Sequence, residues 1–189
     1  AMPADAAPAI LKGMYQFRKG AASNGARVQL LGSGTIFMEA IAAADLLKKD
    51  WGVEADLWSC PSFNELAREG NDCARWNLLH PTEKPRVPHV SACLAETRGP
   101  IIAATDYIKS YADQIRPYVP GRYKVLGTDG FGRSDTRVKL RRFFEVDRFY
   151  IAVAALKALA DEGAIKAGEV SKAIKLYQIN QDKPNPATV

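Results

Sequence analysis

The order of apolar and polar residues between positions 27 and 59 predicts a strand, a turn, a helix and a second strand. Arg27–Leu31 is a short apolar run that leads into the tight turn Gly32-Ser33-Gly34-Thr35. Apolar residues then recur at helical spacing through Thr35–Asp50, and Gly52 follows as a stop signal. Val53–Ser59 alternates apolar and polar side chains, as a strand does. These segments together predict one unit of a layered α/β sheet.

The remaining chain continues this alternation of short strands and helices. Further strands are expected at Ile101–Thr105 and Tyr123–Leu126, and Asp106 is expected to cap a helix over Tyr107–Gln114. His89–Leu94 is compatible with either a strand or a helix. Additional helices are predicted at Phe63–Glu69, Thr136–Phe143, Arg148–Asp161 (capped by Asp147 and ended by Gly163) and Gly168–Leu176.

Three segments are expected to lie outside the regular elements. Residues 1–24 are rich in Ala, Pro, Gly and Ser and indicate a linker or N-terminal arm, whose leading Ala-Met is typical of a cloning remnant. Gly70–Pro88 is polar and marked by prolines, so we expect an irregular surface segment. Asp182–Thr188 is expected to follow the surface as a tail. The pattern therefore predicts one domain over residues 25–189, an α/β/α sandwich of three layers with a mostly parallel, about five-stranded sheet.

Composition supports one soluble domain. The 189 residues are 47% hydrophobic and 25% charged, with neither a secretory leader nor an apolar run long enough to span a membrane. The net charge is +5. The densest basic cluster lacks the exposed aromatic residues of a single-strand binder, so we favour a solvated face over a nucleic-acid surface. This cluster contains Arg137, Lys139, Arg141 and Arg142.

The cysteines and histidines predict no catalytic or metal site. Cys60, Cys73 and Cys93 match no zinc or CxxC spacing, and we interpret them as reduced thiols of a cytoplasmic protein. Cys73 and His80 form a conceivable nucleophile–base pair, which we disfavour because their spacing on irregular chain is a common accident. No GxSxG or HExxH motif occurs.

Two loops remain as candidate binding sites. Gly32, Ser33, Gly34 and Thr35 stand between a strand and a helix, where backbone N–H groups attract anions, but a tight turn with a Ser or Thr cap is the simpler interpretation. Gly127–Arg137 lies where α/β sheets place their ligands. It is either an interface or anion-contact loop, or a loop whose aspartates Asp129 and Asp135 cap backbone groups and pair with Arg133 or Arg137. Its candidate residues are Gly130, Phe131, Arg133, Ser134, Asp135 and Arg137.

Several strings resemble one enzyme family. The stretch VQLLGSGTIFMEAIAAADLLKKDWGVEADLWSCPSF is similar to the start of transketolase-type C-terminal domains. The strings SFNELAREGNDCARWNLLHP, TDYIKSYADQIRPYVP, YKVLGTDGFGRSDTRVKLRRFFEVDR and NQDKPNP resemble the homodimeric pyruvate dehydrogenases, over roughly residues 10–189.

The resemblance implies a parent enzyme that depends on thiamine diphosphate and magnesium. Such an enzyme decarboxylates pyruvate and passes the acetyl group to a lipoyl group of an acetyltransferase component. The magnesium motif of the family, GDG followed by a distant NN, does not occur in this sequence. We therefore assign no catalytic, cofactor-binding or metal-binding residue to this chain and expect no bound cofactor.

The role that the resemblance implies for this chain is assembly. Its expected partners are the remaining domains of the same enzyme, a second subunit of the homodimer and the acetyltransferase component. The alternatives are a docking module that uses the basic loop region, or the equivalent domain of a transketolase or 2-oxoglutarate dehydrogenase. Neither nucleic acid nor a membrane is expected as a partner.

Overall fold

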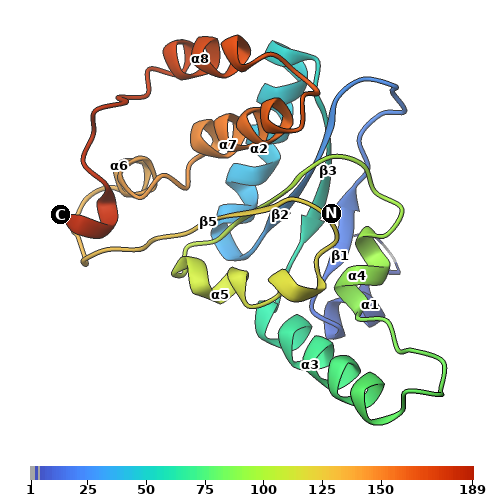
Figure 1. Cartoon of the computed structure of the whole chain (residues 1–189). Helices are drawn as coiled ribbons and strands as arrows, with labels where there is room; N and C mark the ends of the chain where they lie inside the picture. Colours follow the sequence, from blue (N-terminus) through green and yellow to red (C-terminus); the bar gives the residue numbers. More distant parts are fainter. Residues whose placement is uncertain (1–2, 4) are drawn as a thin grey trace.

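Five strands form one sheet in the order β1-β3-β2-β4-β5 (Figure 1). The computed structural model describes residue 3 and residues 5–189, so the expected cloning remnant at residues 1–2 lies outside the described part. Strands β2 to β5 are parallel, and β1 joins the edge antiparallel to β3. The strands are β1 (Tyr15–Arg18), β2 (Arg27–Gly32), β3 (Glu54–Ser59), β4 (Ile101–Ala104) and β5 (Tyr123–Leu126).

Helices cover one face of this sheet with the larger apolar core. Leu30 and Leu57 point from the central strands into this core. The helices on this face are α2 (Phe37–Trp51), α7 (Arg148–Asp161) and α8 (Ala167–Leu176), and α6 (Arg137–Phe143) precedes α7 (Figure 1).

The opposite face carries a second core. Leu31 and Trp58, which neighbour the residues of the first core in sequence, point to this side because successive side chains of a strand alternate between faces. Its helices are α3 (Phe63–Leu79), α4 (His89–Leu94) and α5 (Lys109–Asp113). The two cores confirm the predicted three-layer α/β/α sandwich. Within the described residues, no helix is both long and apolar enough to cross a bilayer.

Short helical turns complete the chain. Helix α1 (Ala7–Leu11) precedes the edge strand. Single 3₁₀ turns lie at Gly34–Ile36, before α2, at Arg116–Tyr118, before β5, and at Pro186–Thr188, near the end of the tail.

The segment predicted to be a linker or N-terminal arm, residues 1–24, contributes α1 and β1 to the domain, so the domain begins before the expected boundary at residue 25. Tyr15 pairs with Ser59, and the preceding Met14 is fully buried in the second core. A strand of four residues has a weak signal in sequence, because its stability depends on the edge of β3 that it covers. The sheet therefore takes its fifth strand from a segment that composition alone assigns to a linker.

The helix predicted at Phe63–Glu69 continues to Leu79, so the prediction of an irregular Gly70–Pro88 is wrong over its first ten positions. Ser62 caps the helix, accepting a hydrogen bond from the Glu65 N–H at 3.1 Å. The ambiguous segment His89–Leu94 is a helix. The predicted helix over Tyr107–Gln114 is shorter, at Lys109–Asp113, and has no side-chain cap.

Candidate functional site at the carboxyl edge of the sheet

The two candidate loops lie on either side of one cavity at the carboxyl ends of β2, β4 and β5. The cavity measures about 550 Å³. Parallel strands bring their carboxyl ends to the same edge, which explains why segments almost a hundred residues apart meet there. Of the candidate residues, the cavity is lined by Thr35, Gly130, Phe131, Arg133, Asp135 and Arg137. Ser134 lies in an adjoining hollow of about 210 Å³, and Gly32, Ser33 and Gly34 are not among the lining residues.

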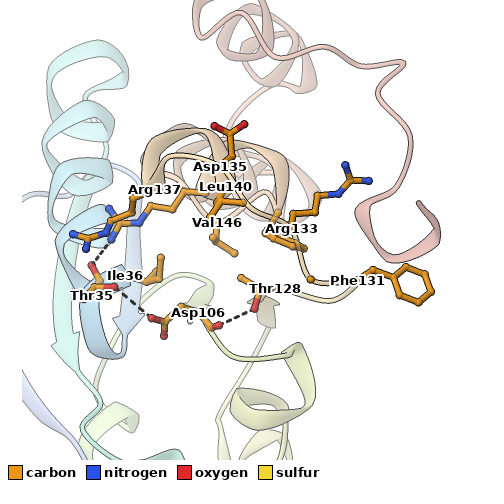
Figure 2. Close-up of a pocket in the computed structure, with 14 residues that line it drawn as sticks. Thr35, Ile36, Asp106, Thr128, Phe131, Arg133, Asp135, Arg137, Leu140 and Val146 are labelled. Atoms are coloured by element: carbon orange, nitrogen blue, oxygen red, sulfur yellow. Dashed lines mark hydrogen bonds between the residues drawn. The ribbon is translucent and has the colours of Figure 1, made fainter.

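Side-chain hydrogen bonds join the turn after β2 to the residues that follow β4. Ser33 donates a hydrogen bond from its buried hydroxyl to Thr105 Oγ1 at 2.8 Å. Thr35 Oγ1 donates to Asp106 Oδ2 at 3.3 Å (Figure 2). Neither hydroxyl caps the helix that follows, so the predicted Ser or Thr cap is wrong. The predicted cap by Asp106 is also wrong, because its carboxylate faces Thr35 instead.

The loop after β5 is held by neighbours other than its own arginines. Asp129 accepts a hydrogen bond from the Lys109 N–H at 3.1 Å and forms an ion pair with Lys109 Nζ at 3.2 Å. Asp135 accepts from the Thr136 N–H at 2.7 Å and lies 3.8 Å from Lys139 Nζ. Both aspartates therefore cap backbone N–H groups, as the second interpretation of this loop predicts, but the pairing with Arg133 or Arg137 in that interpretation is wrong.

The structure divides the basic cluster into two kinds of residue. Arg141 donates to Glu39 at 2.8 Å, and Arg142 donates to the carbonyl oxygens of Tyr177 and Gln178 at 2.7 Å each. Arg137 has no carboxylate within 4.0 Å among residues 3 and 5–189. Arg141 and Arg142 thus stabilise the fold, whereas Arg137 is exposed to solvent.

Glu39 is a buried carboxylate that the pattern of α2 does not single out, because it occupies a polar place in an amphipathic helix. It accepts hydrogen bonds from the Arg148 side chain at 2.9 Å and the Arg148 N–H at 3.0 Å, besides Arg141. Burial acts to raise the pKa of Glu39, but the hydrogen bonds and charge of Arg148 and the charge of Arg141 outweigh it and lower the pKa below its usual value. Glu39 therefore stays ionised and joins α2, α6 and α7 beside the cavity.

The remaining lining residues of the cavity have only ordinary apolar signals in sequence. They include Ile36, Leu140, Phe144 and Val146, which form its inner wall. Asp106 and Thr128 complete its floor, and Thr128 Oγ1 donates to the Asp106 carbonyl oxygen at 2.7 Å.

The thiols are no stronger candidates for chemistry. Cys73 donates to Glu69 Oε1 at 3.4 Å, whereas His80 stacks on Trp76 with ring centroids 4.4 Å apart. Cys93 Sγ lies 3.5 Å from His89 Nε2, a contact that the sequence did not suggest. Burial raises the pKa of all three thiols, which disfavours the thiolate form that a nucleophile needs.

The described residues also do not fit the magnesium and thiamine diphosphate implied by the resemblance. Over residues 3 and 5–189, no three His, Cys, Asp or Glu side chains lie together as ligands of a metal ion. The carboxylates that line the cavity, Asp106 and Asp135, accept from a hydroxyl and a backbone N–H respectively, and no group of three possible metal ligands includes them in this part of the chain. We therefore derive no reaction step through either group on this chain.

Comparison with known proteins identifies close relatives. The model of the family described as "Transketolase-like TK C-terminal domain" matches residues 13–147. The pyruvate dehydrogenase E1 component of Cupriavidus necator is 68% identical over the whole chain, and that of Escherichia coli is 51% identical over 98% of it. The chain spans about a fifth of these relatives' length, 21% in each case.

Solved structures support the fold independently. The transketolase of Campylobacter jejuni superposes with a TM-score of 0.51 and 19% identity, over 78% of this chain and 19% of that one. A transketolase of Pichia stipitis gives a TM-score of 0.51 and 16% identity, over 80% and 18% of the two chains. At these identities the likeness concerns the fold alone.

Proposed function

Because this chain belongs to the family of transketolase-like C-terminal domains, we propose that it is the assembly domain of a larger, thiamine diphosphate-dependent pyruvate dehydrogenase. The observation that carries this proposal is the 68% identity to a pyruvate dehydrogenase E1 component across the full 189 residues, which make up 21% of that relative. In the parent enzyme, the remaining domains would decarboxylate pyruvate and pass the acetyl group to a lipoyl group.

The contacts around the cavity support a structural role for this domain. Arg141 and Arg148 both pair with Glu39. These three charged groups are therefore held in ion pairs and are not available for proton transfer. A rigid domain contributes to catalysis by holding distant active-site groups in register. The proposal places this domain against the remaining domains of its own subunit and across a homodimer in the cytoplasm, with the cofactor and magnesium held elsewhere in the parent.

Calorimetric titration tests the assignment of cofactor binding to other domains. The 189-residue chain should show no heat of binding when thiamine diphosphate is added with magnesium. A full-length pyruvate dehydrogenase E1 component of Cupriavidus necator serves as the positive control under the same conditions. Binding to the short chain with a Kd of about 1 µM to 1 mM, the usual range for small ligands, would contradict the proposal.

A further inference from the structure

Exposed apolar side chains surround the mouth of the carboxyl-edge cavity. Phe131 lines the cavity and is 71% exposed, although it is a large hydrophobic residue. Val138 follows Arg137 directly in α6 and is 76% exposed. Nearby, Tyr107 and Ile108 are 60% and 56% exposed, and their backbone packs directly against Gly127 at the start of the loop. Single exposed apolar residues are ordinary, but several around one cavity indicate an interaction surface.

Two cations at this mouth have no carboxylate partner. Arg133 lies over the Phe143 ring at 4.0 Å from its centroid, and Arg137 is exposed. Neither has an Asp or Glu oxygen within 4.0 Å among the described residues, whereas Lys139 in the same segment does. Cations beside exposed apolar groups fit a partner that carries carboxylates together with an apolar side chain.

The directions of these side chains fit an extended segment better than a small anion. Figure 2 shows Arg137 extending towards Thr35, whereas Arg133 and Phe131 extend away from it on the other side of the cavity. An ion small enough to enter the cavity would meet the Asp106 carboxylate in its floor. A peptide that crosses the mouth can reach both arginines without approaching Asp106.

The partner is not a second copy of this chain. Acidic residues are adjacent or flank one apolar residue in three segments, Glu54-Ala55-Asp56, Glu145-Val146-Asp147 and Asp161-Glu162. Each of these carboxylates already lies within ion-pair distance of a cation of the same chain. A second copy therefore offers no acidic segment with an apolar residue between free carboxylates.

We propose that Phe131, Arg133 and Arg137 form a docking surface for an acidic segment of a different protein, which places an apolar side chain between its carboxylates. This inference goes beyond the assembly role, because it rests on the exposed charges and apolar groups of this edge and on no property of the parent reaction.

Fluorescence anisotropy tests the surface with a defined probe. The probe is a fluorescein-labelled peptide in which pairs of glutamates flank single phenylalanine and leucine residues. The double variant R133E/R137E should weaken binding at least about tenfold, and F131A about threefold or more. Raising the salt concentration from about 50 to 200 mM should weaken binding several-fold, because these cations are exposed.

A matched variant controls for the change in net charge. K49E/K84E reverses two exposed lysines that lie on α2 and after α3 and that also have no carboxylate within 4.0 Å in the described chain. It should bind the peptide as the wild type does, and near-ultraviolet circular dichroism should show that every variant is folded.

Four outcomes would overturn the inference. The first is no binding of the peptide by the wild type at low salt. The second is an equal loss in K49E/K84E, which would indicate net charge alone. The third is displacement of the peptide by inorganic pyrophosphate at equal concentration, which would indicate a small-anion site. The fourth is self-association, measured by light scattering, that R133E/R137E abolishes.

Discussion

Glu39 concentrates more charge-assisted hydrogen bonds than any other carboxylate beside the cavity. Its oxygens accept from Arg141 Nη1 at 2.8 Å, from Arg148 Nε at 2.9 Å and from the Arg148 N–H at 3.0 Å. Its side chain is 6% exposed and that of Arg141 is 16% exposed, so removal of its charge leaves the Arg141 cation in a poorly solvated space, whereas Arg148, which is 45% exposed, stays in contact with water. One residue in the first turn of α2 thereby holds the end of α6 and the start of α7.

We predict that E39Q lowers the free energy of unfolding at neutral pH by about 1–3 kcal/mol, since it leaves the half-buried Arg141 without a counter-charge. The pKa of Glu39 in the fold is below the usual 4.5 of an unfolded chain. The stabilisation is therefore complete above pH 4.5 and is lost as pH falls through the lower, folded-state pKa. Urea unfolding across this acidic range should show a shallower pH dependence in E39Q than in the wild type.

Glu83 provides the control for this experiment. It is exposed in the segment after α3 and has no cation within 4.0 Å among the described residues. E83Q should change the free energy of unfolding by less than about 0.5 kcal/mol at any of these pH values. An equal effect of both substitutions would contradict the role of Glu39.

Among the elements, α3 shows how a glycine can lie inside a helix. An ideal Cβ at Gly70 would stand 2.4 Å from the ring of Tyr118. The helix therefore continues through Gly70 because this residue lets an aromatic ring pack directly on the backbone, and the packing offsets its poor helix propensity.

We predict opposite effects of alanine at two helical glycines. G70A should lower the free energy of unfolding by about 1–3 kcal/mol, because its methyl group overlaps Tyr118. G168A in the first turn of α8, where nothing lies within 4 Å of the new Cβ, should raise it by up to about 1 kcal/mol. Thermal and urea unfolding of both variants measure the difference. Stabilisation by G70A would show that the Tyr118 ring can move to accommodate the methyl group, and would contradict this prediction.

The sequence predicts the elements that carry their own periodicity and misses those that depend on distant contacts. Helix α7 follows Asp147, whose carboxylate accepts from the Phe149 and Tyr150 N–H groups as its position predicts. Strand β1 needs the edge of β3, and the second half of α3 needs Tyr118, which lies 48 residues beyond Gly70. Asp106 looks like a helix cap but turns to Thr35, which follows another strand.

Across the whole molecule, the tail returns to the carboxyl edge and packs on the candidate loop. Pro186 is buried, and its carbonyl oxygen lies 2.3 Å from the position of an ideal Cβ at Gly130. Lys183 forms an ion pair with Glu145 at 3.0 Å. The tail was expected to follow the surface, and the structure shows that it packs against the loop that bears Phe131.

We predict that G130A separates the tail from this loop. Gly130 has φ +129°, which disfavours any side chain, and the added methyl group would overlap the Pro186 carbonyl. The free energy of unfolding should fall by about 1–3 kcal/mol, and the amides of Ala187 and Thr188, both bonded to Asn185, should exchange faster with deuterium.

G132A is the matched control for this loop, because nothing lies within 4 Å of its new Cβ. It should leave both the free energy of unfolding and the exchange of the tail amides within experimental error of the wild type. Unchanged exchange in G130A would instead show that the tail does not depend on this contact.

The sequence predicts where the candidate site lies, but it does not predict which of its charged residues are free to bind a ligand. The sequence predicts Gly127–Arg137 at a ligand-bearing edge, and a parallel sheet brings the turn after β2 to the same edge. Which arginines remain unpaired could not be predicted, because the partners of Arg141 and Arg142 lie on α2, before α7 and after α8. Pairing over such distances has no local signal in the sequence.

The return of the tail has a practical consequence for anyone who labels or immobilises this protein. A purification tag or fluorophore fused after Val189 would emerge beside Phe131, since Pro186–Thr188 ends against that loop. Such a fusion would shield the arginines from a ligand or add charges of its own. The first strand, β1, lies at the edge of the sheet opposite β5 (Figure 1). Surface capture through a residue close to β1 therefore leaves the cavity accessible.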